Sequence, residues 1–201
     1  MVEFIPLFSS PVIKIQTKPD FDDIRSDFIK FCYRERENDS RGMHRSNQGG
    51  WHSELLLNQE RFMKCRDFLE KFIVKSFQPY IKSSATLDVN SFWININGPG
   101  AINSVHNHPG SHLSGVFWVK ATEYSGSLGF SNPNDFIHYP LLRTVSEETK
   151  GTYSFSEKYF FRPIEGDMVI FPSNMNHFVH ENEDCEDRIS IAFNMCIYEQ
   201  D

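Results

Sequence analysis

Apolar residues in the first 80 positions recur at helical spacing in two segments. One run follows Asp20 with an apolar residue every three or four positions, which predicts a helix that is capped by Asp20 and ends near Tyr33. A similar run predicts a second helix from about Gln59 to Gln78, capped by Asn58. Before them, residues 3–16 alternate loosely and predict a short strand.

After these helices the pattern changes to short β-rich runs that are separated by glycine and proline. The polar, Gly-ended stretch at 34–50 predicts a loop, which is a candidate lid. The chain is therefore expected to be mainly β, a compact sandwich or barrel with helices covering one face. The predicted strands are 87–96, 112–120, 127–130, 168–171 and 188–198.

Composition limits the classes of protein that the chain can represent. Its 201 residues suit a single domain with a real core, and the net charge of −7 does not favour nucleic-acid binding. The four scattered cysteines form no CxxC pair, which favours reduced thiols and a cytoplasmic location. The N-terminus does not resemble a signal peptide, and no stretch approaches the ~18 apolar residues of a membrane span, so no membrane association is expected.

The histidines suggest a metal site. The stretch VHNHPGSHLSG contains His106 and His108, which would share one face of an extended strand and could point at one ion. A second group contains His177 and His180, three residues apart, so at most one of them is expected to be a ligand. On its own, a His-x-His pair is more often a surface or core pair than a metal site, and the interpretation needs independent support.

That support comes from the segment that begins at Arg188. In a strand, Arg188 and Ser190 lie on one face, while Ile189 and Ile191 lie on the other. The polar face is either the solvated side of an edge strand or the lining of a ligand cavity, and the strand pattern alone does not choose between them. In a cavity, the guanidinium and the hydroxyl would suit a carboxylate.

The order of these motifs resembles the iron(II)- and 2-oxoglutarate-dependent oxygenases. The likeness is closer still to an uncharacterised branch found in marine bacteria and their phages, and it covers about residues 90–196. The residues that carry it are Trp93 and Asn95, Gly100, His106 to Pro109, Leu113 to Val116, Gly166 and Asp167, Phe171 to Ser173, His177, and Arg188 to Ser190.

This resemblance implies a double-stranded β-helix, or jelly roll, within a single domain. Residues 1–85 would supply an N-terminal strand and the covering helices, and residues 86–201 the catalytic core. His106 and His177 would bind Fe(II), and Arg188 with Ser190 would bind the distal carboxylate of 2-oxoglutarate. Asn95 is a candidate contact of the cofactor, with a structural role in the sheet as the alternative.

The chain departs from the family at His108, which occupies the place where most members have Asp or Glu. A neutral imidazole keeps the open coordination positions but removes one negative charge, so the iron should be harder to oxidise. Three histidines also suit zinc, copper or nickel, so another divalent metal is possible in the purified protein. We favour ligation by His108 over a two-histidine site completed by water. His112 is not expected to be a ligand.

The leading function is a dioxygenase that hydroxylates an unidentified small-molecule or protein substrate. One alternative is a zinc hydrolase or hydratase with three histidine ligands, which leaves Arg188 and Ser190 unexplained. Another is a non-catalytic binding module that has kept the jelly roll. A homo-oligomer is possible on this sequence.

Overall fold

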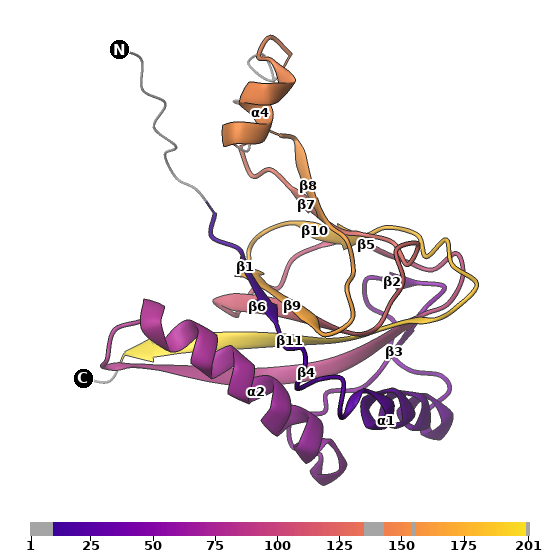
Figure 1. Ribbon diagram of the computed structural model, residues 1–201. Coiled ribbons are helices and arrows are strands. Elements are labelled where there is room, and N and C mark those ends of the chain that lie inside the picture. The colour runs from indigo at the N-terminus through magenta and orange to yellow at the C-terminus, as the bar shows by residue number, and fades with distance from the viewer. Residues whose placement is uncertain (1–9, 135–142, 154–155, 200–201) are drawn as a thin grey trace.

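Two antiparallel β-sheets form the body of the computed structural model, which describes residues 10–134, 143–153 and 156–199 (Figure 1). The larger sheet has the order β1 (Ile13–Gln16), β9 (Asp167–Pro172), β6 (Leu113–Lys120), β11 (Arg188–Glu199), β4 (Ala85–Asn97) and β3 (Trp51–His52). The smaller sheet has the order β2 (Asn47–Gln48), β5 (Ile102–His106), β10 (His177–Val179), β7 (Leu128–Ser131) and β8 (Lys158–Phe161). This architecture confirms the prediction of a mainly β chain.

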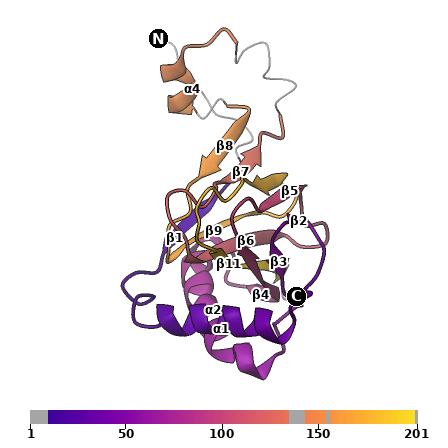
Figure 2. The same cartoon turned by 90° about the vertical axis from the view of Figure 1, so that its right-hand side faces the viewer.

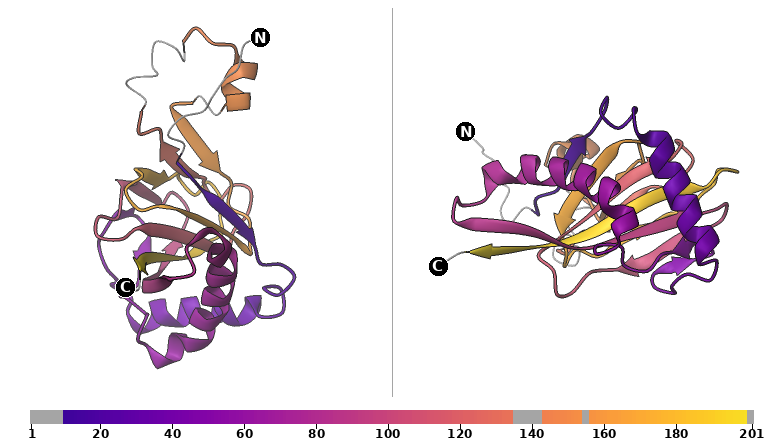
Figure 3. Two further views of the ribbon diagram at one scale, coloured as in Figure 1. Left: turned by 90° about the vertical axis from the view of Figure 1, so that its left-hand side faces the viewer. Right: turned by 90° about the horizontal axis from the view of Figure 1, so that it is seen from below.

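The longest helices lie against the outer face of the larger sheet. They are α1 (Arg25–Asn38) and α2 (Met63–Phe77), and Figure 3 shows both crossing this face when the molecule is seen from below. The main hydrophobic core lies between helices and sheet. It includes Ile189, Ile191 and Phe193 of β11, all fully buried. The apolar face of β11 therefore packs against the helices, and its polar face points towards the smaller sheet.

A second, smaller core lies between the two sheets. It joins Trp118 of β6 and Phe171 of β9 to Leu128 and Phe130 of β7. The short helix α4 (Glu147–Tyr153) stands apart from this body, beyond β7 and β8 at one edge of the smaller sheet (Figure 2). None of the helices in the described part of the chain combines the length and the apolar character that a membrane span requires.

The predicted bounds of the first helix are wrong at both ends. Asp20 lies in a run of turns and is not the cap, because α1 begins only at Arg25. Phe21 is nevertheless fully buried and makes an edge contact with the ring of Phe117. Its place in the apolar pattern therefore indicates a buried residue and not a helical one. The helix continues through part of the predicted 34–50 loop, because buried Glu35 is paired at 2.8 Å with Arg61 beside α2.

The second helical segment has three parts. A 3₁₀ turn (Glu60–Phe62) precedes α2, and another (Gln78–Tyr80) follows it. The predicted Asn58 cap is absent, since Gln59 precedes the first turn and makes no side-chain cap.

The five predicted strands are found within two residues of their bounds, but β2, β3, β5, β8 and β10 were missed. The predicted strand in 3–16 corresponds to β1, and its residues 3–9 lie outside the described part.

Candidate metal centre and co-substrate pocket

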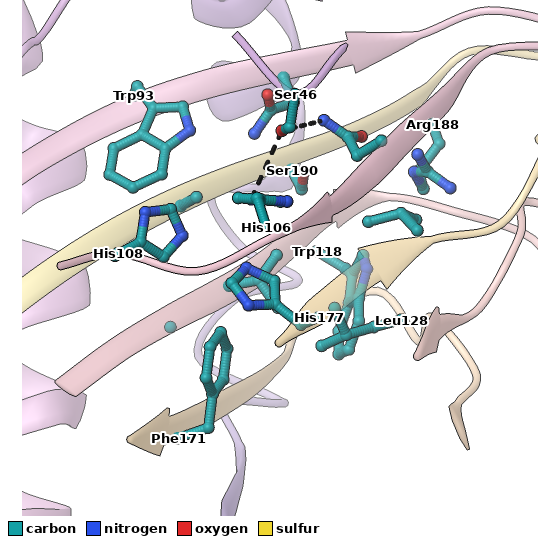
Figure 4. Close-up of a pocket in the computed structure, with 16 residues that line it drawn as sticks. Ser46, Trp93, His106, His108, Trp118, Leu128, Phe171, His177, Arg188 and Ser190 are labelled. Carbon is teal, nitrogen blue, oxygen red and sulfur yellow. Dashed lines mark hydrogen bonds between the residues drawn. The ribbon is translucent and has the colours of Figure 1, made fainter. Parts of the chain in front are cut away.

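Cross-strand pairing brings two of the predicted ligands together. β10 runs antiparallel to β5, and His177 stands directly opposite His106 in the register. Both rings point into the space between the sheets (Figure 4), with centroids 4.2 Å apart. Two histidines 71 positions apart in the chain thus become neighbours through one pair of short strands.

His108 joins them by a different route from the one expected. β5 ends at His106, so the two histidines do not share a strand face. Instead, the backbone N–H of His108 donates to the carbonyl of Ser173, at 2.9 Å, just past β9. This bond holds the His108 ring 5.0 Å from that of His177. One ring nitrogen from each of the three residues lies within 4.8 Å of the other two.

Backbone carbonyls fix the orientation of two rings. Nδ1 of His106 lies 2.7 Å from the carbonyl oxygen of Ser104, and Nδ1 of His177 lies 2.9 Å from that of Met175. Since a carbonyl can only accept, each Nδ1 carries the proton and each Nε2 keeps its lone pair. This is the usual arrangement behind a metal-bound histidine.

All three imidazoles are neutral near pH 7. Burial, followed by the neighbouring histidines, lowers the pKa of His177 to about 3 and that of His108 to about 4. Burial also lowers the pKa of His106. Three uncharged rings with little competition from protons are suited to a divalent cation.

The other histidines near the site have different partners. His112 accepts a hydrogen bond at Nδ1 from the backbone N–H of Ile197, and it is not among the residues that line the cavity. The His180 ring packs 5.0 Å from that of Phe160. Sequence reasoning missed His52, which is buried and stacks on Trp93 of the cavity lining, with ring centroids 5.8 Å apart.

Arg188 is a buried cation at the start of β11. Its side chain is 2% exposed, and Nη1 donates to the backbone carbonyls of Ser125, Gly126 and His180. None of the ion pairs formed among the described residues includes Arg188. Burial lowers its pKa to about 10, so the group stays charged at neutral pH. A buried charge without a counter-ion is unfavourable, and an anionic ligand would relieve it.

Two polar side chains accompany the guanidinium. Ser190 lies two positions along β11 and faces the same cavity, and Asn95 stands directly opposite Ser190 on β4. The Oδ1 atom of Asn95 is buried without a hydrogen-bond partner among the described residues. The side-chain oxygen of Asn95 can therefore accept a hydrogen bond from a ligand.

These groups line one cleft of about 550 Å³, part of which is open to solvent. Arg188 lies at one end, Trp93 and His108 lie at the other, and His106 and His177 lie between them (Figure 4). No lining residue in the described part of the chain is acidic, so an ion here would find nitrogen and hydroxyl donors but no carboxylate.

Residues 91–194 match the sequence profile of the protein family described as "Putative 2OG-Fe(II) oxygenase". The chain belongs to this family. The match covers all three histidines and Arg188. No curated protein sequence matches the chain.

Solved structures of such oxygenases share the fold at low sequence identity. A Pseudomonas putida prolyl-4-hydroxylase is 14% identical, with 94% of each chain covered and a TM-score of 0.57. The epimerase SnoN from nogalamycin biosynthesis, in a complex with Fe3+ and alpha ketoglutarate, is 9% identical over 96% of this chain and 82% of its own, with a TM-score of 0.65. A viral collagen prolyl hydroxylase from Paramecium Bursaria Chlorella virus-1 is 11% identical over 92% and 94%, with a TM-score of 0.54. The predicted double-stranded β-helix is confirmed.

Fe(II) and 2-oxoglutarate are therefore the metal and co-substrate of this oxygenase. The residues present fit both groups. Three neutral imidazole nitrogens can hold a divalent ion, and an unpaired buried guanidinium can hold a carboxylate. The group that could hold the ion consists of His106, His108 and His177, and the described lining of the cleft adds no carboxylate to it.

Proposed function

We propose that the protein is a dioxygenase that hydroxylates a substrate still to be identified, with His106, His108 and His177 as its metal ligands. Family membership supports the reaction class, and the convergence of three ring nitrogens within 4.8 Å supports the ligand set. With Fe(II) and 2-oxoglutarate bound, the site would use molecular oxygen as the oxidant: one oxygen atom converts a substrate C–H bond to C–OH, and the other enters succinate as 2-oxoglutarate loses carbon dioxide.

The buried charge of Arg188 is the main observation that supports the proposed co-substrate site. In this proposal its guanidinium binds the distal carboxylate of 2-oxoglutarate, with the hydroxyl of Ser190 as a further donor. The remaining length of the molecule then extends towards the histidines, past Asn95. Because the cleft contains no acidic side chain, the dianion meets no like charge along this path.

His108 is the unusual member of the ligand set. Its ring nitrogens make no hydrogen bond with a described residue, yet the ring is held beside those of His106 and His177. A ring with free nitrogen atoms at this position supports ligation over a site of two histidines and water. Three neutral ligands leave the full charge of Fe(II) uncompensated, so binding of the 2-oxoglutarate dianion should be favourable.

Succinate formation tests this function without knowledge of the substrate. The purified protein would be supplied with Fe(II), ascorbate and 2-oxoglutarate, and succinate would be compared with that from an Arg188→Ala variant. Arg34→Ala is the matched control, because Arg34 is exposed on α1. We expect the wild type and the control to produce succinate and Arg188→Ala to produce far less.

Other outcomes would contradict the proposal. Equal succinate from the wild type and Arg188→Ala would remove the assigned role of the guanidinium. Stoichiometric zinc in protein purified without added metal, together with no 2-oxoglutarate binding, would favour the zinc hydrolase. Binding of 2-oxoglutarate without uptake of any metal would indicate a binding module.

A further inference from the structure

Ser46 brings a hydroxyl group to the histidine cluster from a distant part of the chain. It stands just before β2 and lines the same cleft as the three histidines. Its Oγ lies 3.4 Å from Nε2 of His106, the nitrogen assigned above to the metal (Figure 4). Sequence reasoning placed this residue in a possible lid and gave it no chemical role.

The neighbouring hydrogen bonds decide which way the Ser46 proton points. Nδ1 of His106 donates to the Ser104 carbonyl, so Nε2 can only accept. Nδ2 of Asn103 donates to Oγ of Ser46 at 3.2 Å, which occupies a lone pair of the hydroxyl oxygen. The hydroxyl proton of Ser46 is therefore directed at Nε2 of His106.

The Asn103 amide is itself held in one orientation. Its Oδ1 accepts a hydrogen bond from Nδ2 of Asn97, at 3.2 Å, so that Nδ2 faces Ser46. Asn97 is 1% exposed and Asn103 is 7% exposed, and a buried amide pair of this kind resists rearrangement. The direction of the Ser46 hydroxyl is thus set by a chain of three polar side chains that begins on β4.

The backbone around Ser46 is fixed on β5. The carbonyl of Ser46 accepts from the N–H of Ser104 at 2.8 Å, and Asn47 pairs with Asn103 in the β2–β5 register. The side chain of Gln48 adds a bond of 2.7 Å to Oγ of Ser104. Ser46 therefore cannot easily withdraw from the site.

A glycine allows this segment to approach β4 closely. A Cβ at Gly50 would stand 3.1 Å from the Asn97 side-chain amide, tighter than an ordinary contact, and would press on the first member of the chain. The absence of a side chain at Gly50 thus preserves the position of the Asn97 amide on which Asn103 and Ser46 depend.

We propose that Ser46 is a further residue of the metal centre. Its hydroxyl group donates a hydrogen bond to an oxygen ligand of the bound metal. This inference rests on the proposed function. A metal bound to Nε2 of His106 would take the lone pair that Ser46 now uses. The hydroxyl then needs another acceptor. Since the Ser46 segment is fixed on β5, the acceptor in this proposal is an oxygen atom of 2-oxoglutarate at the metal, or a metal-bound water where 2-oxoglutarate is absent.

Cobalt(II) provides a probe whose visible spectrum reports the ligands of the metal. Co(II)-loaded wild type, Ser46→Ala and Ser46→Thr would be titrated with 2-oxoglutarate. Ser104→Ala is the matched control, because Ser104 belongs to the same set of contacts but does not line the cleft. We expect 2-oxoglutarate binding to be about tenfold weaker in Ser46→Ala, as for loss of one hydrogen bond to a charged group. Ser46→Thr and Ser104→Ala should stay within about threefold of wild type.

Two results would overturn the proposal. One is unchanged 2-oxoglutarate affinity in Ser46→Ala. The other is an equal loss in Ser46→Ala, Ser46→Thr and Ser104→Ala, which would indicate a structural role alone.

The titration also separates this inference from the proposed function. If wild type binds Co(II) and its spectrum does not respond to 2-oxoglutarate, the proposed function fails. The role of Ser46 is then judged from the spectra without 2-oxoglutarate, in which Ser46→Ala should differ from both wild type and Ser104→Ala. Identical spectra would overturn it, and so would a wild type that takes up no Co(II).

Discussion

Replacement of Arg188 by methionine separates the effect of the buried charge on folding stability from its effect on ligand binding. Methionine keeps much of the length and the apolar stem of the side chain but removes the guanidinium. In the absence of ligands, the guanidinium is held only by backbone carbonyls, and it has no acidic partner among the described residues. The substitution should therefore damage ligand binding much more than folding.

The magnitudes follow from the burial of the group. Lowering of the Arg188 pKa to about 10 corresponds to about 3 kcal/mol of unfavourable burial. Arg188→Met removes this unfavourable burial energy, but it also removes hydrogen bonds that stabilise the folded state by a similar amount. The free energy of unfolding should therefore fall by less than about 3 kcal/mol. Loss of the partner of a buried carboxylate costs about 3–5 kcal/mol, so 2-oxoglutarate should bind at least about 100-fold more weakly.

Calorimetry of 2-oxoglutarate binding to the Mn(II)-loaded protein without oxygen gives the affinity, and urea unfolding of the metal-free protein gives the stability. Arg34→Met is the control for removal of an exposed arginine. The reasoning is refuted if Arg188→Met binds 2-oxoglutarate within about tenfold of wild type. It is also refuted if the variant loses more than about 5 kcal/mol of stability, because Arg188 would then serve the fold.

Further substitutions test the ligand set and the packing beneath it. His108→Ala should bind Co(II) at least about tenfold more weakly, whereas His112→Ala should match wild type; equal affinities, measured by competition with a chelator, would indicate a two-histidine site. A Cβ at Gly115 would overlap the Phe193 ring in the core, so Gly115→Ala should lower the free energy of unfolding by about 1–3 kcal/mol. Gly151 on α4 faces open space, so Gly151→Ala should cause no such loss in the same urea experiment. Similar stability of the two variants would show that the core near Phe193 adapts.

The sequence is most informative where a strand is long and has two unlike faces. The alternation from Arg188 to Phe193 correctly assigns Ile189 and Ile191 to the core, and it puts Arg188 and Ser190 together on the opposite face, which lines the cleft in the structure. The pattern cannot say whether the polar face meets solvent or a cavity, because that depends on the second sheet. The order of the motifs resolved this ambiguity through the resemblance to a known family.

Short strands and long-range contacts explain what the sequence could not predict. β2 and β10 have two and three residues, too few to show a period, yet they bring Ser46 and His177 to His106. The position of His108 depends on a bond to Ser173, which lies 65 residues away in the chain. Helix bounds failed for a similar reason, since the ion pair of buried Glu35 with Arg61 stabilises a segment whose polarity favoured a loop.

The most direct test of the metal centre is a crystal structure of the protein with Mn(II) and 2-oxoglutarate bound in the absence of oxygen. The account predicts one ion bound to Nε2 of His106, to Nε2 of His177 and to a ring nitrogen of His108. It also predicts the distal carboxylate of 2-oxoglutarate on the guanidinium of Arg188. An ion that leaves His108 uncoordinated, or a 2-oxoglutarate molecule bound away from Arg188, would contradict it.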